Sequence, residues 1–136
     1  MTPFTSLLVA TDLSAAGHHA VRRAALLAQA HRARLHLLHM LETPRCRALR
    51  QRLFPTKGAD LAAAHALGAL HRLAAEVAGT CGATPTVEVV AGDPVQALRR
   101  AAEHADLVVL GHRGHAGRGA PWLGSALGRM VRACPR

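Results

Sequence analysis

The chain has 136 residues, of which 50% are apolar and only 2% aromatic, so we expect a single domain over residues 1–136 with a core of small side chains. Its formal charge of +9 suits anionic partners, but so few aromatic rings argue against a nucleic-acid surface that works by base stacking. The three cysteines contain no C-x-x-C pair, which argues against a zinc site and a disulfide framework. No apolar run is long enough to cross a bilayer, which argues against a membrane partner, so we expect a cytoplasmic protein.

The first predicted elements are a short strand and a helix. Residues 7–10 form a continuous apolar run, which is typical of a strand that is buried on both faces. Ser14 is a candidate N-cap for a helix over residues 15–31. Within that segment one stripe recurs at steps of three and four residues, and it consists of Ala16, Ala20, Ala24, Leu27 and His31.

Residues 35–41 predict the second strand, and a basic, irregular connection over residues 42–58 follows it. His36 and His39 lie three residues apart in this strand, so they point to opposite faces and cannot form a local metal-binding pair. We interpret them as packed or edge histidines.

The second half of the chain continues the alternation. A helix over residues 59–78 ends at Gly79 or Gly82, and another helix begins at Pro94 after the candidate N-cap Asp93. Strands are predicted over residues 86–90 and 106–110, and a last helix follows Ser125. Strict alternation of strands and helices favours an α/β fold with a parallel sheet covered on both faces. Ligands in such sheets bind beyond the carboxyl ends of the strands.

A glycine-rich loop joins the fourth strand to the last helix. It contains Gly111-His112-Arg113-Gly114, then nine residues, then Gly124-Ser125. Glycines allow the backbone to approach a bulky anion, and the start of a helix offers free N–H groups and partial positive charge to phosphate. Arg113 can add positive charge from the loop. A flexible connection is the alternative interpretation; the loop is neither a Walker A motif nor a dinucleotide fingerprint.

The spacing Gly-x-x-Gly, nine residues, Gly-Ser resembles the pattern of the ATP-binding branch of the universal stress protein (UspA-type) family. Residues 9–14, 37–40, 92–94 and 105–111 are also similar to that family, and the likeness covers about residues 4–134 in one register. The resemblance implies a three-layer α/β sandwich with a parallel sheet, adenine nucleotide alpha hydrolase-like, with flavodoxin-like topology. It also implies a homodimer that binds ATP with Mg²⁺ and serves stress response or regulation.

The resemblance assigns roles to residues at four places in the chain. Thr11 and Asp12 would contact the adenine and ribose end, and Met40 would lie against adenine. The ribose and phosphates would meet Leu110, Gly111 and Gly114, while the phosphate tail would be held by Gly124, Ser125 and Ala126. Two alternatives stay open: Met40 as an ordinary core residue at a strand end, and Asp12 as a side chain that bonds N–H groups of its own turn.

One feature departs from the family pattern. Members usually end with a fifth strand, whereas this sequence reaches Cys134-Pro135-Arg136 without one. The fifth strand is therefore expected to be missing, which leaves the fourth strand as an open edge and puts the family's dimer mode in doubt.

No general base is poised for hydrolysis in the sequence, so we expect a nucleotide-binding regulator and not an enzyme, with slow ATP hydrolysis at most. The alternative is a regulator without nucleotide that acts through protein contacts. A nucleotidyltransferase is a weaker alternative, since His112, Gly114 and His115 match its His-x-Gly-His signature but follow the fourth strand and not the first. A metal site on those histidines lacks further ligands, and no recognised nucleic-acid motif is present.

Overall fold

The computed structural model describes residues 4–13, 15–40, 52, 58–82, 84–90 and 94–110. In chain order the elements are β1 (Ser6–Ala10), α1 (Ala15–His31), β2 (Arg34–Met40), α3 (Gly58–Cys81), β3 (Thr86–Val90), α4 (Pro94–Ala102) and β4 (Leu107–Leu110). Every strand and helix expected within the described residues is present. The glycine-rich loop and the last expected helix lie outside them.

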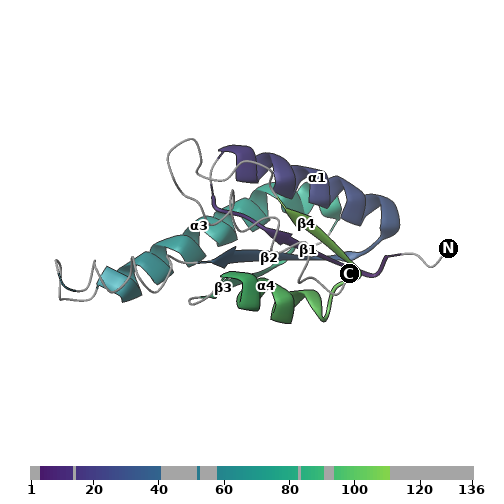
Figure 1. Cartoon of the computed structure of the whole chain (residues 1–136). Coiled ribbons are helices and arrows are strands. Elements are labelled where there is room, and N and C mark those ends of the chain that lie inside the picture. The colour runs from purple at the N-terminus through teal and green to yellow at the C-terminus, as the bar shows by residue number, and fades with distance from the viewer. Residues whose placement is uncertain are drawn as a thin grey trace.

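The four strands form one parallel sheet in the order β3-β2-β1-β4. Helices α1 and α3 cover one face and α4 covers the other (Figure 1). The expected three-layer α/β sandwich is therefore confirmed. The strand order differs in one detail from the expected flavodoxin-like topology, in which β1 lies between β2 and β3. Here β2 lies between β1 and β3, so the order 3-2-1-4 matches the first four strands of the dinucleotide-binding fold. No fifth strand is seen among the described residues.

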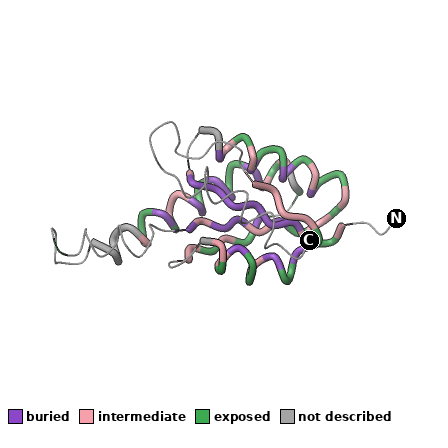
Figure 2. The backbone as a smooth tube through the Cα atoms, viewed as in Figure 1, coloured by how far each residue is buried: buried purple, intermediate pink, exposed green. Residues whose placement is uncertain are grey.

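The core lies on both sides of the central strands (Figure 2). Leu7 and Val9 pack under α1 and α3, whereas Leu8 and Ala10 pack under α4. All four are at most 2% exposed, as expected for an apolar run that alternates between two covered faces. Hydrophobic burial on both faces thus fixes β1 at the centre of the molecule.

The buried face of α1 differs from the predicted stripe. Among the described side chains of α1, those without solvent exposure are Val21, Ala24, Ala25 and Ala28. Among the described side chains, only Ala24 belongs to both sets, and the predicted stripe's Ala20, Leu27 and His31 are half-buried at the margin of the buried face. Alanines occur on several sides of this helix, so periodicity alone does not choose between adjacent faces. Contact with both the sheet and α3 decides the face that is buried.

Both long helices are followed by a residue in the left-handed backbone conformation. In α1 this residue is Arg32, with φ 53°, and it forms a Schellman motif in which Ala33 N–H donates to Ala28 O at 2.8 Å. In α3 it is Gly82, one of the two predicted stops, whose N–H donates to Ala78 O at 3.0 Å. Within the described part of the chain, no helix is long and apolar enough to cross a membrane.

Candidate functional site

Four of the predicted binding residues meet at one edge of the sheet. Thr11 and Asp12 directly follow β1, Met40 ends β2 and Leu110 ends β4. Because the strands are parallel, their carboxyl ends lie together, and Ala10 at the end of β1 is in register with both Leu38 and Leu110. The chain order reverses between β1 and β4, which is where ligands bind in open α/β sheets.

The other predicted binding residues are outside the described residues: Gly111, Arg113, Gly114, Gly124, Ser125 and Ala126. Their assigned contacts with ribose and phosphates stay predictions.

Thr11 is 1% exposed and is bonded within the protein through three of its polar groups. Its N–H donates to Leu38 O at 2.9 Å, and its Oγ1 accepts the N–H of Leu13 at 3.0 Å. Its carbonyl oxygen lies 2.8 Å from Nδ1 of His39. These bonds tie the turn after β1 to β2, and contact between Thr11 and a nucleotide stays a prediction.

Asp12 is 7% exposed, and its carboxylate lies beside the start of α1. A Cβ placed on Gly17 would stand 2.7 Å from Asp12 Oδ1 and 2.6 Å from Thr11 Oγ1. Gly17 lies in the first turn of α1, where the partial positive charge of the helix stabilises a carboxylate. This position is compatible with the turn-bonding role left open for Asp12, and it keeps the carboxylate at the carboxyl edge of the sheet.

Met40 is 4% exposed and packs in the core cluster under α4, which also includes Leu98 and the half-buried Leu110. Its side chain therefore has the packing expected of an ordinary core residue at a strand end. Since Met40 and Leu110 line the same apolar layer from two strands, a ligand at this edge would meet apolar side chains next to the backbone of two strand ends.

The helices give the two edges of the sheet opposite partial charges. Helices α1 and α4 begin just after β1 and β3, so their N-termini lie toward the carboxyl edge. Helices α1, α3 and α4 all end just before a strand, so their C-termini lie toward the amino edge. Aligned peptide dipoles favour anions at helix N-termini and cations at helix C-termini. A phosphate group is therefore favoured at the carboxyl edge.

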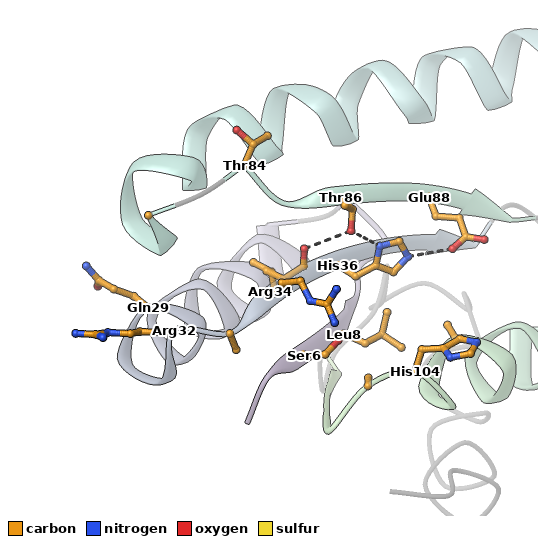
Figure 3. A pocket seen from close by; sticks show the side chains of 15 residues that line it. Ser6, Leu8, Gln29, Arg32, Arg34, His36, Thr84, Thr86, Glu88 and His104 are labelled. Atoms are coloured by element: carbon orange, nitrogen blue, oxygen red, sulfur yellow. Dashed lines mark hydrogen bonds and ion pairs between the residues drawn. The ribbon is translucent and has the colours of Figure 1, made fainter. Parts of the chain in front are cut away.

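A pocket of about 820 Å³ opens at the amino edge (Figure 3). Arg32 and Arg34 lie there beside the ends of α1, α3 and α4, where cations complement the helix dipoles. The partial negative charge of three helix C-termini opposes the arginines of this pocket, and ligands of open α/β sheets bind beyond the carboxyl ends of the strands. We therefore place the candidate nucleotide site at the opposite edge.

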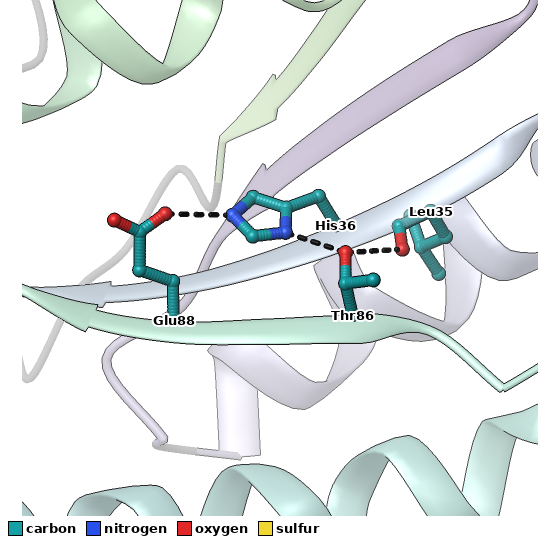
Figure 4. Close-up of polar contacts among 4 residues, drawn as sticks. All are labelled: Leu35, His36, Thr86 and Glu88. Atoms are coloured by element: carbon teal, nitrogen blue, oxygen red, sulfur yellow. Dashed lines mark hydrogen bonds and ion pairs between the residues drawn. The ribbon is translucent and has the colours of Figure 1, made fainter.

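One wall of this pocket carries a cross-strand polar cluster (Figure 4). His36 Nδ1 lies 2.6 Å from Thr86 Oγ1, and its Nε2 lies 2.9 Å from Glu88 Oε2. The His36 and Glu88 side chains are 30% and 50% exposed, so the pair links β2 to the sheet's edge strand at a solvated surface, where such pairs contribute little. His36 and His39 bond on opposite faces, as predicted. Among the described residues, no group of three or more histidine, cysteine or acidic side chains is placed to hold a metal ion.

The sequence profile of the universal stress protein family matches residues 3–136. The chain belongs to the universal stress protein family. Among solved structures it is similar to the universal stress protein UspA from Lactobacillus plantarum, with 28% identity and a TM-score of 0.77 over 99% of this chain and 95% of that one.

A second similar structure is a universal stress protein in complex with cAMP, with 25% identity and a TM-score of 0.62 over 98% of this chain and 93% of that one. The hypothetical protein MJ0577 shares the fold, with a TM-score of 0.79 at 18% identity over 99% of this chain and 93% of that one. No curated protein sequence matched.

Sequence reasoning missed two residues that shape the site of this universal stress protein. The helical pattern assigns Gly17 no role, and the strand spacing identifies His39 only as a packed or edge histidine. Both touch the turn that carries Thr11 and Asp12. The available signals were weak: a glycine in the first turn of a helix, and a histidine one residue before the end of a strand.

Proposed function

We propose that this universal stress protein binds an adenine nucleotide, with ATP as the first candidate, at the carboxyl edge of its sheet. The observation that carries the proposal is the juxtaposition of Thr11 and Asp12, Met40 and Leu110 at the point where the strand order reverses. The family resemblance assigns Thr11 and Asp12 to the adenine and ribose end, Met40 to the adenine, and Leu110 to the ribose and phosphates, from separate parts of the sequence. The fold brings them to one place.

The chemistry of the described residues fits that end of a nucleotide. The carboxylate of Asp12 can accept hydrogen bonds from ribose hydroxyls, and the apolar layer of Met40 and Leu110 suits the face of a base. Helix N-termini at the same edge favour the phosphates. In this proposal the loop from Gly111 to Ala126 holds the phosphate tail and its Mg²⁺.

The nucleotide acts in this proposal as a ligand that biases conformation or assembly, and the homodimer is the form we expect it to influence. Turnover is slow or absent, because the sequence offers no general base for hydrolysis. The complex of a relative with cAMP favours a second candidate, a cyclic adenine nucleotide at the same edge. Both candidates share the adenosine contacts and differ in what the glycine loop must hold.

The first test is to denature freshly purified protein, identify the released small molecules by mass spectrometry, and titrate the emptied protein with Mg-ATP and separately with cAMP. ATP or ADP released at near one per chain, or saturable binding of Mg-ATP, supports the proposal. Tighter binding of cAMP than of Mg-ATP selects the cyclic nucleotide. Absence of any release or binding overturns the proposal and favours a regulator that acts through protein contacts.

A variant tests the part assigned to the loop. Gly124→Val should abolish binding of Mg-ATP in a folded protein, because the added side chain blocks the approach of phosphate to the backbone. Gly79→Val is the matched control: it adds the same side chain near the end of α3, where nothing lies within 4 Å of a Cβ, so its affinity should equal that of the unaltered chain. Unchanged affinity in a folded Gly124→Val protein would remove the loop from the site.

A further inference from the structure

The turn after β1 contains an unfavourable backbone conformation that surrounding contacts must stabilise. Leu13 has a φ of 65°, in the left-handed region that residues with a side chain seldom adopt. Such a conformation persists only where the surroundings hold it, and it is common at ligand sites. The supports of this turn are therefore candidates for a role in presenting Asp12.

Three of these supports come from β2 and from the turn itself. Thr11 N–H continues the β1–β2 pairing to Leu38 O, and the N–H of Leu13 is held by Thr11 Oγ1. The third is His39, whose Nδ1 lies 2.8 Å from the carbonyl oxygen of Thr11. A carbonyl oxygen only accepts, so Nδ1 of His39 carries the proton and donates it.

The bond from His39 acts on Asp12 through the peptide group. The carbonyl of Thr11 and the N–H of Asp12 belong to one planar unit, which rotates as a whole. Holding that carbonyl therefore fixes the direction in which the backbone of Asp12 leaves the turn. On the other side, the start of α1 closes on Thr11 and Asp12 at Gly17, so the turn is held between β2 and α1.

We propose that His39 is a positioning residue of the nucleotide site: through the Nδ1–H bond to Thr11 it fixes the Thr11–Asp12 peptide and so the direction in which Asp12 meets the ribose. This inference rests on the proposed function for its ligand. It assigns His39 no contact with the nucleotide, and it separates this histidine from His36, which lies on the opposite face of β2.

The test compares two substitutions of His39 in the full chain, which place a side-chain amide nitrogen at different distances from the backbone. In His39→Asn the amide nitrogen is attached to Cγ, as Nδ1 is in histidine, so the donor is kept in place; in His39→Gln it lies one bond further out. We expect Mg-ATP to bind His39→Asn with nearly native affinity. We expect roughly tenfold weaker binding to His39→Gln, the equivalent of one ordinary hydrogen bond. His36→Asn and His36→Gln are the matched controls and should both bind as the unaltered chain does.

Equal affinity of His39→Asn and His39→Gln would overturn the inference. Two readouts in the nucleotide-free protein separate it from the proposed function. Exchange of the Leu13 amide should be slow in the unaltered chain and in His39→Asn, and faster in His39→Gln. In the unaltered chain, a nitrogen NMR spectrum should show a proton on Nδ1 of His39, and an unprotonated Nδ1 would overturn the inference even if no variant folded. If these two readouts hold and Mg-ATP does not bind, the proposed function fails, and the role of His39 is reduced to shaping the turn.

Discussion

Gly17, in the first turn of α1, allows the helix to approach the turn after β1 closely. Gly17 is buried, and the space where its Cβ would stand is already taken by Thr11 and Asp12, both of which are nearly inaccessible to solvent. Glycine in a helix costs backbone entropy, so its presence here has a steric reason. The close approach brings the carboxylate of Asp12 to the positive end of the helix.

Gly17→Ala should therefore destabilise the protein, although alanine is the better helix former. The methyl group would stand at 2.6 Å from Thr11 Oγ1 and 2.7 Å from Asp12 Oδ1, and neither atom can retreat into solvent. We expect a net loss of about 1 kcal/mol in the free energy of unfolding, measured by urea denaturation.

Gly68→Ala is the control, because the nearest atom to its Cβ would be the flexible end of Arg72 at 3.7 Å. It should raise the free energy of unfolding by about 0.5–1 kcal/mol through helix propensity alone. A stabilising Gly17→Ala, of the same size as Gly68→Ala, would contradict the steric account.

At the scale of elements, an acidic clamp aligns the starts of β1 and β4. Asp106, just before β4, accepts three hydrogen bonds through Oδ2: from Thr5 N–H at 2.8 Å, from Thr5 Oγ1 at 2.8 Å and from Ser6 N–H at 3.1 Å. Its own N–H donates to Ser6 O at 2.8 Å. The clamp joins residues about a hundred positions apart in the sequence and sets the register in which Ala10 meets Leu110 at the far end.

Asp106→Ala should lower the free energy of unfolding by about 1 kcal/mol, because two backbone N–H groups lose a charged acceptor at an exposed site, where solvent screens the interaction. Asp106→Asn should lose less, since an amide oxygen still accepts but carries no charge. Glu103→Ala removes the same charge from the end of α4 and serves as the control in urea denaturation. If Asp106→Ala and Glu103→Ala had equal effects, the clamp would contribute nothing beyond its charge.

Over the whole molecule, positive charges outnumber negative ones, and the helix dipoles give the two edges of the sheet different partial charges. The chain carries 17 basic and 8 acidic side chains. At low ionic strength the excess positive charges within one folded molecule repel one another, which destabilises the compact state. The fold adds a direction to this excess, because helix N-termini face the carboxyl edge and helix C-termini face the amino edge. In the proposed function, the positive net charge and the helix N-termini at the carboxyl edge would both favour an anionic ligand.

Raising the salt concentration should stabilise the nucleotide-free protein. The screening length falls from about 30 Å at 0.01 M to about 8 Å at 0.15 M, which weakens repulsion across a chain of charge +9. We expect a relief of about 1 kcal/mol, or a rise in Tm of about 4 °C, in sodium chloride and without phosphate in the buffer. A fall in Tm over that range would mean that attractive ion pairs outweigh the net repulsion.

The sequence alone determined the element types and order, because strand and helix patterns depend on neighbours a few residues away. The apolar run at residues 7–10 predicted β1 and its burial, Pro94 marked the start of α4, and Gly82 was one of two predicted ends of α3. The sequence also led to the family, through motifs that cover most of the chain.

Only the tertiary structure decided which face of α1 is buried, how the strands are ordered, and what holds the turn at Thr11. These features depend on contacts between distant parts of the chain: His39 with Thr11, Asp106 with Thr5, α1 with α3. No local pattern reports such contacts, since an alanine-rich helix has several similar faces and a half-buried histidine has many possible partners. The candidate site was therefore predictable as a set of residues, but its geometry arises from the packing of β2 and α1 around one turn.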